Sequence, residues 1–276
     1  MTNHDTLSRE GIFDSHAHYF DRRFAEETAG AEDILATEVF GRGVCGVINV
    51  GTGHESNRRC IEQAARYPQM YAAVGLHPED VHYGCGALDD ELAPLRAMLG
   101  TAETRRRDKI VALGEIGLDY HVENPDKERQ AAFFEAQLTL AEELDLPVII
   151  HDREAHGDCF ETVLKYPRVR GVFHSFSGSA EMARELTRRG WYVSFSGVIT
   201  FKNARRVREV ASLTDPEKIL VETDCPYLSP EPYRGKLNSS ARLCHIAESL
   251  SDALGLSVDK TVSLTSENAR RLFGIK

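Results

Sequence analysis

The sequence lacks the features that mark membrane-spanning and disulfide-stapled proteins. No apolar run approaches the roughly 20 residues needed to span a bilayer, and the opening MTNHDTLSREG is polar, without a basic start followed by an apolar stretch. The six cysteines include no C-x-x-C pair, and a chain of 276 residues needs no disulfide framework. We therefore expect a cytoplasmic protein with reduced thiols and no membrane association.

A positive net charge is also missing. The formal net charge of −10 argues against a protein that coats nucleic acid, because that affinity depends on Lys and Arg side chains that neutralise phosphates. It does not exclude a nucleic-acid enzyme, since a short substrate end held by metal ions needs only local positive charge. The basic clusters at 105–107, 188–189 and 202–208 are typical of solvated helix faces.

Short aliphatic runs recur along the chain. Several are almost continuously apolar instead of alternating, which favours parallel strands covered on both faces. There are eight such runs, at 11–18, 44–51, 70–77, 110–119, 147–151, 171–176, 192–197 and 219–224.

Segments with helical spacing lie between these runs. In 126–146, Phe134, Leu138 and Ala141 fall on one face, and Asp126 is placed to cap the first turn. A second helix is expected from Ser177 to the stop signal at Gly190.

Alternation of strand and helix at intervals of about 20 to 40 residues is the pattern of βα units. Eight units predict an α/β fold of the (β/α)8 TIM-barrel type, with residues 1–276 as a single domain and a doubly wound open sheet as the alternative. The tail 249–276 is predicted to form helices that cover the outside of the barrel.

Ionisable side chains gather at the ends of the predicted strands, which in a barrel form one face and carry the active site. Residues two apart on a strand point to the same side, so His16 and His18 can reach one ion from inside the barrel. The full set is His16, His18, His77, Glu115, Asp119, His151, His174 and Asp224.

Each of these residues also has a structural interpretation. An isolated histidine at a strand end is usually a hydrogen-bonded structural residue, H-x-H alone is weak, and Asp224 could start a turn at Pro226. Together, however, these imidazoles and carboxylates would be costly to bury without cations to pair the acids. The set therefore predicts a metal site of nitrogen and carboxylate ligands.

The number of ligands favours two divalent ions over a single tetrahedral zinc. Glu115 is the candidate bridge, and Asp224 can also take a proton from bound water. Asp14 is expected to orient an imidazole. The ions would be held by His16, His18 and Asp224 on one side and by His151 and His174 on the other.

Eight motifs occur in an order that resembles the TatD family of metal-dependent deoxyribonucleases, within the wider amidohydrolase-like barrels. The resemblance runs from Ile12 to Phe273. The motifs are FDSHAH, VGLHP, GEIGLDY, QLTLAEELDLPVIIHDREA, HSFSGS, ETDCPYLSP, RGKLN and TSENARRLFG.

This resemblance implies hydrolysis of phosphodiesters, commonly as a 3′ to 5′ exonuclease on single-stranded DNA, with one or two divalent ions such as Mg²⁺, Mn²⁺ or Zn²⁺. Asp224 would act as a base and Glu115 as a metal bridge. His77 matches a position that contacts the substrate phosphate, and Arg153, Arg234 and Asn238 are further candidate substrate contacts. The implied metal ligands are His16, His18, Glu115, His151, His174 and Asp224.

The sequence departs from the family pattern at two places. Ser239 and Ser240 stand where Glu-Pro is usual, and that glutamate often helps to pin the loop against the barrel. Tyr19 and Phe20 stand where a Leu-Asp pair is commoner, and both are expected at the mouth of the site.

Two other functions fit the same residues. The same metal centre could hydrolyse an amide, a lactone or a small phosphorylated metabolite, because the substrate is decided by variable loops. Glu115, instead of a lysine that could be carboxylated, favours the TatD-like subset. A non-catalytic metal-binding or nucleic-acid-binding module is disfavoured by the surplus of ligands and by the acidic charge.

Overall fold

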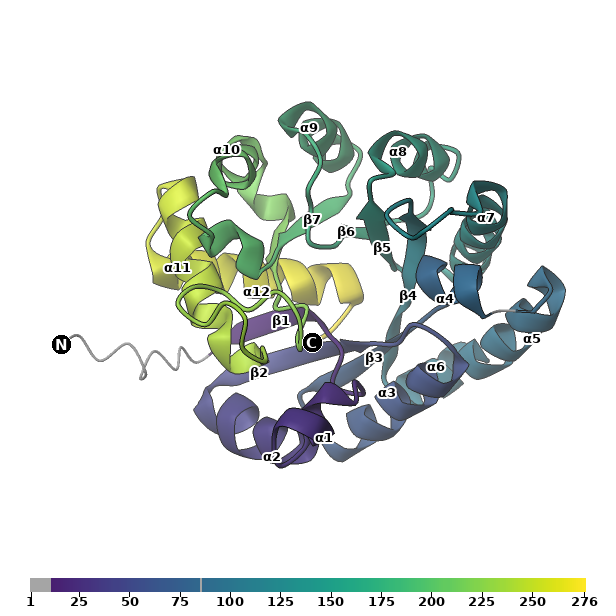
Figure 1. Ribbon diagram of the computed structural model, residues 1–276, viewed down its shortest axis with the longest axis horizontal. Helices are drawn as coiled ribbons and strands as arrows, with labels where there is room; N and C mark the ends of the chain where they lie inside the picture. The colour runs from purple at the N-terminus through teal and green to yellow at the C-terminus, as the bar shows by residue number, and fades with distance from the viewer. Residues whose placement is uncertain (1–10, 85) are drawn as a thin grey trace.

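The computed structural model describes residues 11–84 and 86–276. Its centre is an eight-stranded parallel sheet in which the strands follow one another in chain order (Figure 1). The polar opening and Cys85 lie outside the described residues. The strands are β1 (Ile12–Ala17), β2 (Val44–Val50), β3 (Met70–Val74), β4 (Ile110–Asp119), β5 (Val148–Arg153), β6 (Gly171–Phe173), β7 (Tyr192–Phe195) and β8 (Ile219–Val221).

The last strand returns to the first, so the sheet closes into a barrel. Ala17 forms a parallel bridge with Cys225, just beyond β8. The backbone N–H of Asp224 donates to the carbonyl of His16 (2.9 Å), and the N–H of His18 donates to the carbonyl of Cys225 (2.7 Å). These bonds confirm the predicted (β/α)8 barrel and rule out the open doubly wound sheet. The single domain over 1–276 stays a prediction, which the single sheet supports.

Helices surround the strands (Figure 1). None of those in the described part of the chain is long and apolar enough to cross a membrane. The α-helices are α1 (Arg23–Glu27), α2 (Ala31–Ile34), α3 (His54–Arg66), α4 (Pro78–Tyr83), α5 (Leu88–Leu99), α6 (Ala102–Arg107), α7 (Lys127–Leu144), α8 (His156–Leu164), α9 (Ala180–Arg188), α10 (Arg205–Leu213), α11 (Leu243–Leu254) and α12 (Val258–Phe273).

The two helices with clear sequence signals form as expected. The Asp126 carboxylate accepts a hydrogen bond from the backbone N–H of Arg129 (3.0 Å) and caps α7. Phe134, Leu138 and Ala141 are buried on its inner face. Helix α9 starts slightly later than predicted, because Ser179, not Ser177, supplies its capping hydroxyl.

Helix α12 corrects the prediction for the tail. Its last turns do not only cover the outside, because Ala269, Leu272 and Phe273 join one buried cluster with residues from all eight strands. Apart from Val50, the last residue of β2, the strand residues of this cluster precede the strand ends, so the C-terminal part of α12 lies at the end of the barrel opposite the site. The strand members are Phe13, Ile48, Val50, Ala73, Ala112, Ile149, Val172, Tyr192 and Leu220.

Truncation of Leu272 tests this closure. Leu272→Ala should lower the free energy of unfolding by about 2–5 kcal/mol, because the buried side chain leaves a cavity under the barrel. Leu213→Ala on α10 is the matched control, since that leucine is 44% exposed and should change stability by less than about 0.5 kcal/mol. Denaturant unfolding measures both, and equal losses would contradict the assignment.

Candidate metal centre

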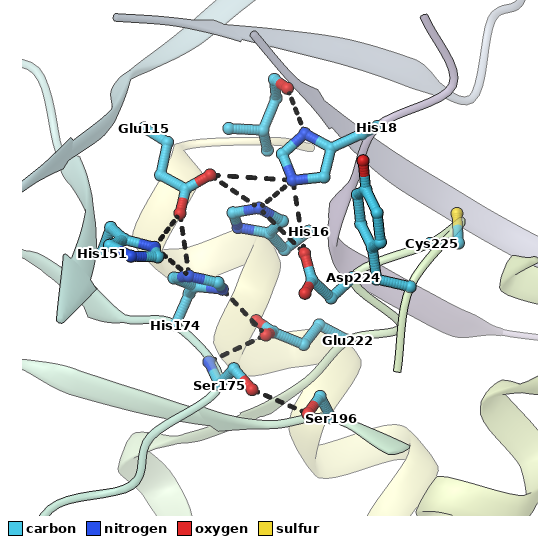
Figure 2. A network of polar contacts seen from close by, with 12 residues as sticks. His16, His18, Glu115, His151, His174, Ser175, Ser196, Glu222, Asp224 and Cys225 are labelled. Carbon is cyan, nitrogen blue, oxygen red and sulfur yellow. Dashed lines mark hydrogen bonds and ion pairs between the residues drawn. The ribbon is translucent and has the colours of Figure 1, made fainter. Parts of the chain in front are cut away.

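Six of the strand-end residues singled out in the sequence lie close together at the C-terminal mouth of the barrel (Figure 2), namely His16, His18, Glu115, His151, His174 and Asp224. Strands β1, β4 and β5 carry three of the six predicted ligands, and the segments after β1, β6 and β8 carry the other three. Gly117 makes the approach of β4 to β5 possible, because a Cβ there would lie 2.0 Å from the carbonyl oxygen of His151. The local sequence GEIGLD therefore fits a tight contact between two ligand-bearing strands.

One group of donors comes from β1, from the residue directly after it and from the segment after β8. The Nε2 atoms of His16 and His18 lie 3.0 Å apart. Asp224 Oδ1 is 3.7 Å from Nε2 of His16 and 3.3 Å from Nε2 of His18. All three ligand atoms lie within 4.8 Å of one another, which is the spacing expected of donors that surround one ion.

Glu115 lies between this group and a second one. Its Oε2 is 3.4 Å from His16 Nε2, whereas its Oε1 is 2.8 Å from His151 Nδ1 and 2.9 Å from His174 Nε2. His77 Nε2 also approaches Oε1, at 3.5 Å. The two carboxylate oxygens therefore face different sets of imidazoles, as a carboxylate that bridges two ions would.

Neighbouring imidazoles keep the carboxyl groups of Glu115 and Asp224 ionised, so both can bind cations. Burial opposes the ionisation of Glu115, but the charges of His174, His77 and His16 hold the pKa of its carboxyl well below the usual value. Burial likewise opposes ionisation of Asp224, and the hydrogen bond from His18 lowers its pKa. Both are carboxylates at neutral pH.

The histidines of the second group hold protons that a cation would displace. Burial disfavours the charged imidazole, but hydrogen bonds to Asp119 and Glu115 raise the pKa of His151 to about 9. Against the same effect of burial, Glu115 and Glu222 raise the pKa of His174 well above its usual value. Metal ligands bind as neutral imidazoles, so metal affinity at this site depends on pH.

The charge of the cavity also fits divalent ions. The cavity has a volume of about 740 Å³. Among the described residues that line it, Arg153 is the one arginine and no lysine is present. This arrangement would repel a phosphate unless cations balanced the acids. The lining acids are Asp21, Glu79, Asp80, Glu115, Asp119, Asp152 and Asp224.

Three of the candidate metal-binding histidines have a ring nitrogen in contact with a further oxygen acceptor. Asp119 Oδ2 is 2.9 Å from His151 Nε2, the Val50 carbonyl is 2.7 Å from His18 Nδ1, and Glu222 Oε1 is 3.2 Å from His174 Nδ1. Such contacts fix the ring orientation of a metal-binding histidine. Sequence reasoning placed Asp119 at a strand end without giving it a role and missed Glu222, although it lies only two residues before Asp224 in ETD.

Asp14 does not orient an imidazole, contrary to the prediction. Its carboxylate accepts hydrogen bonds from the backbone N–H groups of His16 (3.2 Å) and Thr223 (3.0 Å), and from the hydroxyls of Thr223 (2.5 Å) and Ser240 (2.6 Å). A register shift in β1 between Asp14 and Ala17 breaks the simple alternation of sides on which the prediction relied. Burial raises the pKa of Asp14 to about 7. Asp14 thus ties β1 to the segment after β8.

Ser240 takes part in the same tie. The Tyr19 hydroxyl donates to the Ser240 hydroxyl (2.8 Å) and accepts from the Ser240 backbone N–H (2.9 Å). Tyr19 is only 1% exposed, so it lies under the loop and not at the mouth as predicted. The hydroxyls of Ser240 and Tyr19 therefore hold the loop at the position where Glu-Pro is usual. Phe20 does line the cavity.

Two of the four predicted substrate contacts line the cavity, and the other two do not. His77 and Arg153 line the cavity beside the metal ligands. Arg234 instead lies over the ring of Phe201, with the guanidinium 4.4 Å from the ring centroid, and is not part of the lining. Asn238 is fully buried and donates to the carbonyls of Thr223 (3.0 Å) and Tyr227 (2.7 Å). The structure therefore gives Asn238 a role in holding the loop and not in contacting substrate.

Asp119→Asn tests the orienting contact on His151. An amide cannot replace the charged acceptor, so the affinity for Mn²⁺ or Zn²⁺ should fall about 10- to 100-fold, as measured by calorimetric titration of stripped protein. Asp126→Asn on α7 is the control, because asparagine caps a helix as well as aspartate does. Equal affinity in Asp119→Asn and the parent protein would exclude the role.

Comparison with known proteins agrees with this geometry. The family described as TatD related DNase matches residues 13–274. A protein of Bacillus subtilis (strain 168) named "uncharacterized metal-dependent hydrolase YabD" is 36% identical over 267 residues, which cover 96% of this chain and 99% of that protein. An Escherichia fergusonii protein named "3'-5' ssDNA/RNA exonuclease TatD" is 31% identical over 272 residues, which cover 96% and 99%.

A solved structure shares both fold and sequence. The crystal structure of YJJV, a TatD homolog from Escherichia coli K12, superposes with a TM-score of 0.86 at 30% identity and covers 96% of this chain and 98% of its own. The residues that match the family, 13–274, include all strand residues except Ile12 and every candidate ligand of the barrel mouth. The chain therefore belongs to the family of TatD-related DNases, which are metal-dependent hydrolases.

Proposed function

We propose that this protein is a 3′ to 5′ exodeoxyribonuclease that hydrolyses phosphodiester bonds at single-stranded DNA ends with divalent metal ions. The observation that carries the metal chemistry is the position of Glu115, whose two oxygens face separate groups of imidazoles. The choice of nucleic acid as substrate is supported by the name of the Escherichia fergusonii relative.

The residues present suit two divalent ions such as Mg²⁺, Mn²⁺ or Zn²⁺. One ion would be held by His16, His18 and Asp224, the other by His151 and His174, with Glu115 shared. When bound, such ions supply positive charge for the phosphate and make water acidic enough to attack it near neutral pH.

Side chains that line the cavity would accept the proton and bind the phosphate. The Asp224 carboxylate is only 14% exposed and carries a lowered pKa, so it is ionised and placed to accept a proton from the attacking water. His77 and Arg153 would donate hydrogen bonds to the non-bridging phosphate oxygens. Arg153 is an exposed residue of the cavity lining, and its charge helps to lower the pKa of Asp119.

The shape of the site favours the end of a single strand. The cavity has a volume of about 740 Å³, which is in the range that encloses a ligand the size of a drug molecule. A cavity of this size suits the terminal nucleotide of a single strand and is too small for a duplex. The net charge of −10 disfavours duplex binding, which depends on many Lys and Arg contacts to phosphates. Metal ions would supply the local attraction that the protein surface lacks.

Asp224→Asn tests the proton acceptor. The amide cannot take a proton, so turnover should fall by at least about 10²-fold while circular dichroism and the unfolding transition stay close to those of the parent. Asp252→Asn on the exposed face of α11 is the control and should keep full activity. Full activity in Asp224→Asn would exclude it as the base.

Labelled single-stranded DNA tests the reaction itself. With Mg²⁺, Mn²⁺ or Zn²⁺, the 3′ label should be lost before the 5′ label, and a chelator should stop the release because the ligands alone cannot activate water. Gel electrophoresis over a time course gives the order of release. If no metal supports release from DNA or RNA, the exonuclease assignment fails and a small ester, amide or lactone becomes the substrate to test.

A further inference from the structure

The acidic and the apolar side chains of the cavity come largely from different segments. The lining acids Glu79, Asp80, Asp119 and Asp152 come from β4, β5 and the segment after β3. The segments after β6, β7 and β8 and after the adjoining β1 contribute Asp21, Asp224 and three serines to the lining, and they also contribute all but one of its apolar side chains. We call these six apolar side chains the apolar wall, and they are Phe20, Phe176, Val198, Val207, Tyr227 and Leu228.

Tyr227 is the most accessible member of the apolar wall. Among the described residues, the exposed large hydrophobic side chains are Tyr83, Leu213 and Tyr227, and of these only Tyr227, at 44% exposure, lines the cavity. Its ring is held in place, because its hydroxyl donates to Asp21 Oδ2 (2.6 Å) and its edge meets the His18 ring at 6.4 Å between centroids. A fixed, exposed aromatic ring loses little conformational entropy when a planar group stacks on it.

Phe20 also contacts the ring of His18. Its ring centroid lies 5.6 Å from that of His18 at an interplanar angle of 80°. Phe20 occupies the position at which the family pattern more often has an aspartate, so the residue here adds a ring where a further charge would be expected. Both rings therefore lie directly beside a candidate metal ligand.

We propose that the apolar wall is a nucleobase subsite, in which the base of the terminal nucleotide stacks against Tyr227 and Phe20 while its phosphate lies at the metal centre. The inference rests on the proposed nuclease function. Because Phe20 and Tyr227 both contact His18, a phosphodiester bound at the metal centre would have this wall beside its neighbouring nucleoside. Stacking on aromatic side chains is the usual way in which proteins hold single-stranded bases without regard to sequence.

The polar groups near the wall support tolerance of all four bases. The hydroxyls of Ser175 and Ser196 lie 2.8 Å apart and bond to each other. The hydroxyl of Tyr227 is already used by Asp21. The wall therefore offers rings and methyl groups to a base but few free donors or acceptors that would read its edges.

The test uses two single-stranded oligonucleotides that differ only at the 3′-terminal residue, which is thymidine in one and an abasic tetrahydrofuran residue in the other. The parent protein should remove thymidine with a kcat/KM at least about fivefold higher, because stacking of one base contributes about 1 kcal/mol or more. In Tyr227→Leu the ratio should approach one, mainly through a higher KM for the thymidine substrate. Tyr227→Phe keeps the ring and should keep most of the ratio.

Tyr83→Leu is the matched control, because Tyr83 on α4 is 63% exposed and lies outside the cavity lining. It should leave the ratio at the parent value. Bound metal per chain is measured in every variant, so a loss of metal is separated from a loss of stacking. Phe20→Leu gives an independent second variant, which should also lower the ratio if Tyr227→Leu fails to fold.

The possible outcomes separate the two proposals. If the parent protein removes both 3′ residues at equal rates, the nucleobase subsite is wrong and the exonuclease function stands. If it discriminates, but Tyr227→Leu and Phe20→Leu discriminate equally well, the preference arises elsewhere and the subsite is again wrong. If no oligonucleotide is cut with any metal while a simple phosphodiester is, the proposed nuclease function itself fails.

Discussion

The buried carboxylate of Glu115 is the constraint around which the rest of the structure is arranged. One of its oxygens lies next to the imidazole of His16, and the other lies next to those of His151 and His174. A carboxylate with so little access to water is stable only beside positive charge. The barrel supplies that environment by bringing the ends of separate parallel strands to one mouth, where protonated histidines or metal ions can balance the acid.

Closure of the barrel brings the first and last parts of this site together. The β8 ladder ends at Val221, and beyond it the backbone bonds from Asp224 to His16 and from His18 to Cys225 continue the contact. Asp14 reinforces the same seam through Thr223 and Ser240. Ligands that are two hundred residues apart in the chain therefore occupy adjacent positions. The C-terminal part of α12 packs against the opposite end, and the cavity is lined by residues at the strand ends.

The acidic composition and the proposed substrate are compatible because the cations are local. A chain with a net charge of −10 has little long-range attraction for DNA. Within the cavity, divalent ions would reverse the sign of the field at the point where the phosphate must lie. The apolar wall adds contact area for a base without adding charge. Affinity would then depend on ions and stacking at the end of a strand, not on a basic surface along it.

The sequence by itself determined the strands, the barrel and the set of strand-end side chains, because apolar runs mark buried parallel strands and six of the eight runs have ionisable residues at or near their ends. Only the tertiary structure decided which of these residues touch. The register shift in β1 turned Asp14 toward Thr223, the loop after β8 covered Tyr19, and backbone carbonyls took up the Asn238 amide. Strand periodicity encodes the side of a sheet on which a residue lies. Hydrogen-bond partners across a closed barrel depend on contacts between distant segments, which no local pattern records.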